Sequence, residues 1–451
     1  IVMSLENNKM YTMPMKKLIT TMSLPIIVSM VIQALYNIVD SMFVARYSRT
    51  ALDAVSLCYP IQMILIAISI GSALSIQALL ARSLGQQDVK KAEKVLAHGM
   101  MMAVFHSVVF LIFGLFCARW FLSLFSSDVE IINQGVKYMQ IVTIFSFGVH
   151  IEIAYERVMQ ATGNAVYNMI MQSAGALTNI ILDPVLIFGL CGFPAMGITG
   201  AAIATVIGQM LGMSLGIYLT KHHVKDIQVH KEDFKPDFHL FKEMYAIAIP
   251  AMAMNSILSI STVFINKILA EYSTTAVSVY SIFFKLQQFM FMATNGISNA
   301  IIAIISFNYG AKNISRIKEC IKLTLIYTCI IMFAGTILFE SVPSALLGLF
   351  NADSTMLEIG IPTLRICAIS FVLGGINVQI CGMLQALDGS KQSLFLSLLR
   401  QMILIIPCAY ILSKVFGLQA TWWAFVISEV VTSAFSLICL KSTFKRLHTL
   451  M

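Results

Sequence analysis

Residues 62–80 read QMILIAISIGSALSIQALL, nineteen consecutive positions without a charged side chain. A helix needs about 20 apolar residues to cross the hydrocarbon core of a bilayer, so this stretch has the length and composition of a transmembrane span. In residues 287–305, which read QQFMFMATNGISNAIIAII, Gly296 occupies the place that Gly71 has in the first stretch. The two stretches together predict a membrane protein with an internal repeat.

The composition of the whole chain supports a membrane protein. Of its 451 residues, 58% are hydrophobic and 12% are charged, whereas soluble proteins carry about 25% charged residues. The net charge of +8 comes from basic residues scattered in short loops, which excludes a nucleic-acid-binding domain. The nine cysteines show no CxxC or Cys/His ligand spacing, so neither a disulfide framework nor a metal site is expected.

Apolar runs separated by charged residues, glycine or proline predict twelve transmembrane helices. Their expected bounds are 18–44, 52–81, 95–118, 130–155, 165–190, 197–220, 244–270, 277–307, 319–342, 357–387, 392–413 and 418–440. The longest polar stretch, residues 222–242, divides six spans from six. The sequence therefore predicts an N-lobe (1–220), a linker loop (221–243) and a C-lobe (244–451).

The distribution of Lys and Arg predicts the orientation. Loops on the side of the termini and the linker carry 20 basic residues, and the opposite loops carry four. Because basic loops remain cytoplasmic, both termini and the linker are expected in the cytoplasm, with the protein in the plasma (inner) membrane.

The repeat extends over both halves with a constant offset of 225 positions through much of the chain. Matched pairs include Pro25 and Pro250, Ser56 and Ser281, Gln62 and Gln287, and Gly85 and Gly310; later, Gly197 matches Gly417. Six spans per half give both halves the same orientation, which is typical of transporters built from two parallel repeats. We expect an all-α polytopic protein of two six-helix bundles, working by alternating access as a monomer. The chain has no GxxxxGK[ST] phosphate-binding loop.

Ionisable residues inside spans are costly and therefore candidates for function. The first half has Asp40 in span 1 and Asp183 in span 5, with Asn179 one helical turn before Asp183 and Thr205 in span 6. With a rise of ~1.5 Å per residue, the two carboxylates and Thr205 fall at a similar depth, about 6–12 Å from the outer surface. Their oxygens suit Na⁺, and paired carboxylates can instead share a proton. The structural alternative is that Asp183 caps a helix broken at Pro184 and that Asp40 bonds to a neighbouring helix.

Other polar residues carry weaker signals. The second half offers candidates for lining a substrate cleft: Lys285, Gln287, Asn377 and Arg400. Lys285 and Arg400 have an alternative interpretation, in which they pair with carboxylates or extend to the membrane surface. His150, Glu152 and Glu156 come at the end of the predicted span 4, where a solvated helix end is expected.

Several motifs resemble the multidrug and toxic compound extrusion family. They are YNIVD (36–40), QALLARSLG (77–85), QATGN (160–164), NIILDPVLIFG (179–189) and GAAIAT (200–205). In that family an N-lobe cation site is built from residues matching Asp40, Asn179, Asp183 and Thr205. The resemblance implies export of cationic, amphipathic drugs and dyes in exchange for H⁺ or Na⁺, without a cofactor.

One difference from the NorM-like branch of that family indicates which branch the chain resembles. The NorM-like branch has an acidic cation site on the spans that correspond to 7 and 10, where this chain has no carboxylate in the span interior. The chain therefore resembles the DinF-like branch, whose coupling site lies in the N-lobe.

The alternatives to export are a lipid flippase and a membrane-embedded enzyme. A flippase for a lipid-linked precursor shares a many-helix duplicated plan, but it would favour a strongly cationic cavity. Here two intramembrane carboxylates stand against two bases, which favours cationic cargo. A membrane-embedded enzyme lacks support because the chain contains no HExxH or GxSxG motif.

Overall fold

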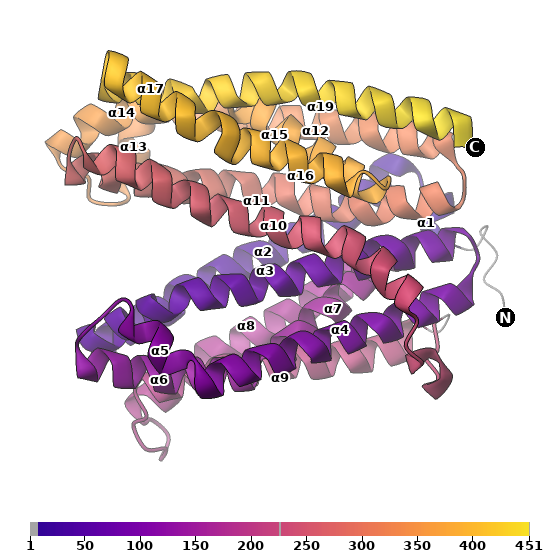
Figure 1. Cartoon of the computed structure of the whole chain (residues 1–451), viewed down its shortest axis with the longest axis horizontal. Helices are drawn as coiled ribbons and strands as arrows, with labels where there is room; N and C mark the ends of the chain where they lie inside the picture. Colours follow the sequence, from indigo (N-terminus) through magenta and orange to yellow (C-terminus); the bar gives the residue numbers. More distant parts are fainter. Residues whose placement is uncertain (1–7, 225–226, 451) are drawn as a thin grey trace. The chain divides into compact units, whose positions relative to one another are not determined.

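The computed structural model describes residues 8–224 and 227–450, with side chains to residue 446. Lys225, one of the basic residues of the linker, lies outside the described residues. The regular elements of the described part are all helical (Figure 1). Those up to the end of the linker are α1 (Lys9–Thr12), α2 (Met15–Tyr47), α3 (Arg49–Gly85), α4 (Val89–Phe116), α5 (Ala118–Ser123), α6 (Val129–Ile144), α7 (Phe147–Ala161), α8 (Ala165–Phe188), α9 (Ile198–His223) and the 3₁₀ turn η2 (Lys231–Phe234). The remainder are α10 (Phe238–Ala270), α11 (Thr274–Gly310), α12 (Ile314–Ser341), α13 (Pro343–Gly348), α14 (Ser354–Ala368), α15 (Phe371–Ala386), α16 (Ser390–Leu398), the π-helix η3 (Leu399–Leu404), α17 (Ile405–Phe416), α18 (Leu418–Thr421) and α19 (Trp423–Leu450).

The predicted all-α membrane fold is confirmed, with two spans that are not straight helices. Within the described residues, ten helical segments are individually long and apolar enough to cross a bilayer. An eleventh span is the pair α14 and α15, bent by 51° where they meet. The predicted span 4 is divided between α6 and α7, which are 16 and 15 residues long and separated at Phe145 and Ser146.

The chain forms two compact units. Among the described residues, unit 1 consists of 24–224 and 227–252 with 8–12, and unit 2 consists of 253–450 with 13–23. Each unit has its own apolar core. The core of unit 1 includes Ala54, Leu65 and Tyr138, and the core of unit 2 includes Phe283, Phe371 and Trp422.

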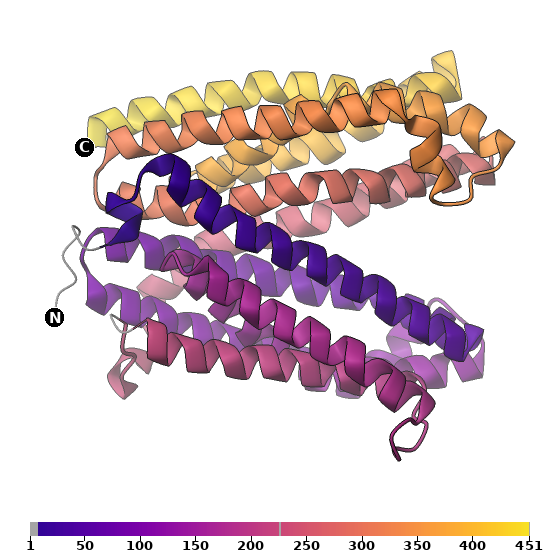
Figure 2. The ribbon, with the colours of Figure 1, turned by 180° about the vertical axis from the view of Figure 1, so that it is seen from behind.

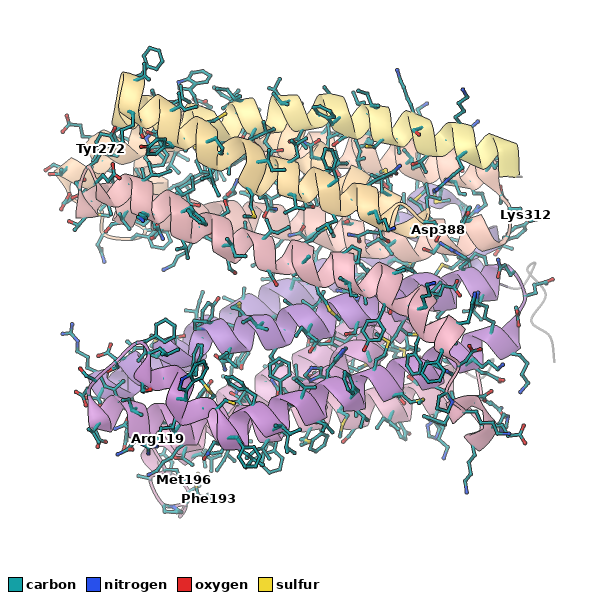
Figure 3. All side chains as sticks on the ribbon, in the orientation of Figure 1. Arg119, Phe193, Met196, Tyr272, Lys312 and Asp388 are labelled. Carbon is teal, nitrogen blue, oxygen red and sulfur yellow. The ribbon has the colours of Figure 1, made fainter. Side chains whose placement is uncertain are left out.

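Loops that the topology places on one side of the membrane gather at one end of each unit. Figure 3 shows Arg119, Phe193 and Met196, from the loops after spans 3 and 5, at the same end of unit 1. In unit 2, Tyr272 lies at one end and Lys312 and Asp388 lie at the other. This alternation is what consecutive antiparallel spans require.

The linker is held against α4 rather than running free. The backbone N–H of Gln228 donates to Glu93 Oε1 (3.2 Å), and that of Asp237 donates to His98 Nε2 (2.9 Å). The Asp237 carboxylate in turn accepts backbone N–H groups of Leu240 and His239 at the start of α10, which lowers its pKa below the usual value. Charge-assisted capping of this kind fixes where α10 begins.

Candidate functional site

The site in unit 1 depends on how closely α8 and α9 approach each other. Glycines on both helices allow backbone contact: a Cβ atom on Gly208 would lie 2.7 Å from the carbonyl oxygen of Gly175, and one on Gly200 would lie 2.6 Å from that of Leu186. Small residues at helix contacts are the usual way in which membrane helices pack tightly. We call this contact of Gly175, Gly200 and Gly208 the glycine seam. It brings Thr205 of α9 against Asn179 of α8.

Asn179, Asp183 and Thr205 form a buried hydrogen-bonded group. With its amide nitrogen facing Asp183, Asn179 donates to Asp183 Oδ2 (2.8 Å) and accepts from the Thr205 backbone N–H (3.0 Å) and hydroxyl (3.2 Å). The opposite orientation would direct the amide oxygen at a carboxylate oxygen. Asp183 is 0% exposed, and Asn179 and Thr205 are also buried.

Asp40 completes the predicted group of four. Figure 2 shows α2 running alongside α8, and the carboxyl groups of Asp40 and Asp183 lie within hydrogen-bonding contact. Two carboxylate oxygens can form such a contact only when they share a proton or a bound cation. The Oδ1 atom of each residue is buried and has no hydrogen-bond partner among the described residues. Two hard oxygen ligands are thus available to a small cation.

The structural alternative for Asp183 is wrong. Helix α8 does not break at Pro184 but continues to Phe188. Because proline has no N–H group, the carbonyl of Ile180, one turn earlier, lacks its intrahelical donor. Asp183 is therefore a buried side chain in the interior of a helix, next to a weakened turn, and does not cap a helix end.

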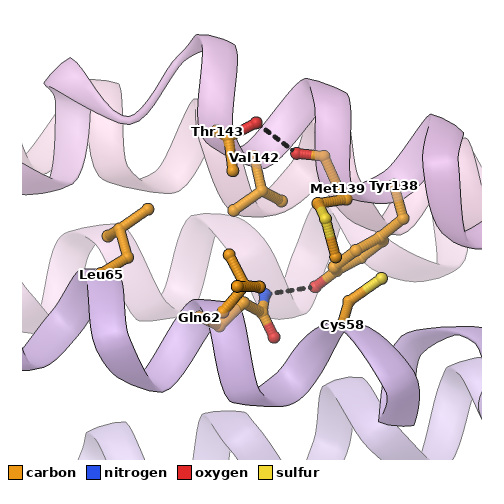
Figure 4. Close-up of a pocket in the computed structure, with 8 residues that line it drawn as sticks. Cys58, Gln62, Leu65, Tyr138, Met139, Val142 and Thr143 are labelled. Carbon is orange, nitrogen blue, oxygen red and sulfur yellow. Dashed lines mark hydrogen bonds between the residues drawn. The ribbon is translucent and has the colours of Figure 1, made fainter. Parts of the chain in front are cut away.

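Two tyrosines that were not among the candidates from the sequence also interact with this group. Tyr36, one turn before Asp40, reaches the Thr205 hydroxyl and interacts electrostatically with Asp40 and Asp183. Tyr138 of α6 interacts electrostatically with Asp40 and accepts a hydrogen bond from Gln62 of α3 (2.9 Å). Figure 4 shows this hydrogen bond in the wall of a small cavity between α3 and α6. The position of Tyr36, one helical turn before Asp40, is the sequence feature that could have identified it as a site residue.

In unit 2, two of the four candidates for lining a substrate cleft, Asn377 and Arg400, both contact Glu429. Glu429 of α19 accepts a hydrogen bond from Asn377 Nδ2 (2.8 Å) and lies 3.6 Å from Arg400 Nη1, in the π-helix η3. Lys285 is exposed and Gln287 half-buried on α11, and no hydrogen bond or ion pair links them to this cluster among the described residues.

Glu429 is absent from the sequence-based candidates, although it lies inside the predicted span 418–440. An acidic residue within a span is the same signal that identified Asp40 and Asp183. Because Arg400 and Asn377 already contact Glu429, both cleft candidates have a partner within unit 2.

The expectation of a solvated end for span 4 is wrong. His150, Glu152 and Glu156 are only 2%, 8% and 6% exposed, because α7 continues to Ala161 and packs against α3, α4 and α9. Arg157, one of the 20 basic residues assigned to loops on the side of the termini and the linker, is also buried in α7 and donates to Gln77 Oε1 (3.2 Å). These residues belong to the interior of unit 1.

Comparison with known proteins identifies relatives along nearly the whole chain. The multidrug export protein MepA of Staphylococcus haemolyticus (strain JCSC1435) is 25% identical over 94% of this chain and 93% of its own length. The protein of the same name from Staphylococcus aureus (strain MRSA252) is 25% identical over 92% of this chain and 91% of its own length.

Solved structures share the fold. A crystal structure of MATE in complex with MaL6 matches with a TM-score of 0.90 at 21% identity, covering 98% of both chains. An outward-facing multidrug resistance MATE family transporter of the MOP superfamily matches with a TM-score of 0.88 at 21% identity, covering 97% of this chain and 96% of its own. The MatE family profile matches residues 25–185 and 250–411, one block in each half of the repeat. The chain therefore belongs to the MatE family.

Proposed function

We propose that the protein is a secondary-active exporter of organic, often cationic, amphipathic compounds, driven by the entry of H⁺ or Na⁺. The observation that carries this proposal is the contact between the Asp40 and Asp183 carboxyl groups inside membrane-spanning helices. Such a pair is stable only with a proton or cation, which makes it suited to coupling. The names of the MepA relatives, multidrug export proteins, support a drug-like cargo.

The roles of the site residues follow from their contacts. Asp40 and Asp183 bind the coupling ion, and Asn179 and Thr205 hold the Asp183 carboxyl in place. We infer that coupling takes place in the N-lobe, which the resemblance to the DinF-like branch also implies. The protein needs no cofactor other than the ion and works as a monomer by alternating access between two inward- and outward-open states.

The function is tested by substrate counterflow in proteoliposomes with pH and Na⁺ gradients imposed separately. We expect a fluorescent organic cation to accumulate against its own gradient when at least one of the two ion gradients is present. Liposomes without protein provide the background. Accumulation at background level under both gradients would rule out a cation-coupled exporter.

We also propose that both termini and the linker face the cytoplasm of a cell whose plasma (inner) membrane holds the protein. The exposed linker residue His230 and the exposed native Cys191, in the loop between α8 and α9, should then lie on opposite sides. A His230→Cys variant without other cysteines should react with an impermeant thiol reagent only after cells are permeabilised.

The matched control keeps Cys191 as the only cysteine and should react in intact cells. Labelling of position 230 in intact cells, with Cys191 protected, would reverse the proposed topology.

A further inference from the structure

A second buried acidic group of unit 1 lies outside the Asp40–Asp183 pair. Glu152, in α7, is 8% exposed and forms no hydrogen bond or ion pair with any described residue. An ionised carboxylate in the membrane interior is unstable without a partner. Glu152 therefore has to be neutralised by something other than the described side chains.

Two glycines make room for the Glu152 carboxyl group. A Cβ atom on Gly212 would lie 1.9 Å from Glu152 Oε1, and one on Gly175 would lie 3.4 Å from the same oxygen. Any side chain at position 212 would occupy the volume that the carboxyl group takes. The glycine seam thus continues into a cradle that accepts the carboxyl group and leaves it unpaired.

The titratable groups that face Glu152 do not compensate its charge. They are Glu156 on α7 and Tyr36 on α2, and none comes from α3, α4, α8 or α9 among the described residues. Glu156 differs in having partners of its own, Gln172 on α8 and the adjacent charge of Arg157. Glu152 is the carboxyl group of this cluster that lacks a neighbouring cation.

At the equivalent position in unit 2, a carboxylate has a positively charged partner. The repeat aligns Glu152 with Asn377, and the match of Gly197 to Gly417 aligns Gln209 with Glu429. Each unit thus has one carboxyl and one amide residue at these two positions, with the types exchanged. In unit 2 Arg400 lies 3.6 Å from the carboxylate, whereas the described part of unit 1 has no such arginine.

Because glycines make room for the Glu152 carboxyl group and no cationic side chain of the described residues lies next to it, we propose that Glu152 is a second proton-binding site of unit 1. Its place in transport rests on the function proposed above. Glu152 lies nine residues before the end of α7 at Ala161, about 14 Å along the helix, and Asp183 lies eighteen residues from the start of α8, about 27 Å. Both helix ends meet at the short loop 162–164, so Glu152 is closer to that side.

Tyr36 is near enough to both sites to interact electrostatically with Asp40, with Asp183 and, most weakly, with Glu152. Glu152 first releases its own proton toward the side of the linker and becomes a carboxylate. A proton that leaves the aspartate pair then restores the charge of that pair and binds to Glu152, which becomes neutral again. Glu152 thus binds the proton on its way from the Asp40–Asp183 pair to the side of the membrane on which the linker lies.

Infrared spectroscopy of the purified protein tests the proposal, because a protonated carboxyl group has a C=O stretching band that shifts in D₂O. The Asp40→Asn/Asp183→Asn double variant serves as the background, so that the pair contributes no band. We expect a protonated-carboxyl band in this background and its loss when Glu152→Gln is added. Glu130→Gln, at an exposed carboxylate that starts α6, is the matched control and should leave the band unchanged.

Glu152→Asp keeps a carboxyl group at this position and should shift the frequency of the band rather than remove it. This variant tests the proposal even if Glu152→Gln does not fold. An unchanged band in a monodisperse Glu152→Gln or Glu152→Asp variant overturns the proposal. The spectra need neither drug nor gradient. If Glu152 gives no band, the proposed export function is unaffected. If counterflow fails, the expected infrared band of Glu152 is unaffected.

Discussion

Replacing Asp183 with asparagine is expected to abolish drug-resistance activity while expression and monodispersity remain near wild type. The change removes the charge with little change of volume, and the new amide can still bond to Asn179, which now contacts Asp183 Oδ2. What is lost is the second carboxyl group, so that a proton or Na⁺ can no longer be shared with Asp40. Asp40→Asn should act in the same way. Growth of cells lacking their own exporters in the presence of cationic dyes measures the effect.

Asp53→Asn is the matched control, because Asp53 is an exposed residue of α3 outside the site and the chemical change is identical. It should retain wild-type resistance. Full transport by both Asp40→Asn and Asp183→Asn would remove the pair from the mechanism.

The affinity of the purified protein for a cationic substrate is expected to fall by about tenfold when the pH is lowered or Na⁺ is added, a coupling free energy of about 1.4 kcal/mol. Two like charges in contact repel, and a bound proton or Na⁺ cancels this repulsion. Packing of α2, α8 and α9 then changes, and substrate affinity changes with it. A ligand can shift the two states only by its differential affinity for them, and the effect on the other ligand is reciprocal.

Equilibrium binding of a fluorescent cation from about pH 5 to about pH 9, with and without Na⁺, measures this coupling. The Asp40→Asn/Asp183→Asn double variant should bind with an affinity that no longer depends on either variable. A flat wild-type affinity, or an equal dependence in the double variant, contradicts the coupling scheme.

The convergence of the four site residues could be predicted because a helix fixes depth. Odd spans run one way and even spans the other, so a rise of ~1.5 Å per residue places Asp40, Asp183 and Thr205 at one level. Depth does not determine which helix faces meet. That choice is made by the glycine seam, where Gly208 lets α9 approach α8 closely enough for Thr205 to reach Asn179.

The buried residues of α7 could not be recognised, because a charged residue near the end of an apolar run is the usual sign that a span has ended. Here the helix continues past Glu156 to Ala161, and Arg157 finds neutral partners in Gln77 and Gln160 inside the bundle. Only the packing distinguishes such a buried polar end from a solvated one.

The pairing of Glu429 with Arg400 was invisible for a different reason. The two residues lie on successive spans, and a sequence does not say which faces of neighbouring helices meet. The π-helix Leu399–Leu404 adds to this, because its extra residue turns the Arg400 side chain away from the direction that a regular α-helix would give.

The same ion pair has a consequence for how the chain is made. A charged side chain in the middle of a membrane helix costs about 2.5–3.5 kcal/mol during insertion by the translocon. The segment Ser390–Phe416 brings Arg400 into the bilayer without a carboxylate partner until Leu418–Arg446 follows with Glu429. Synthesis of the last span therefore completes the stable insertion of the span before it, and a chain truncated between them would leave Arg400 without its carboxylate partner.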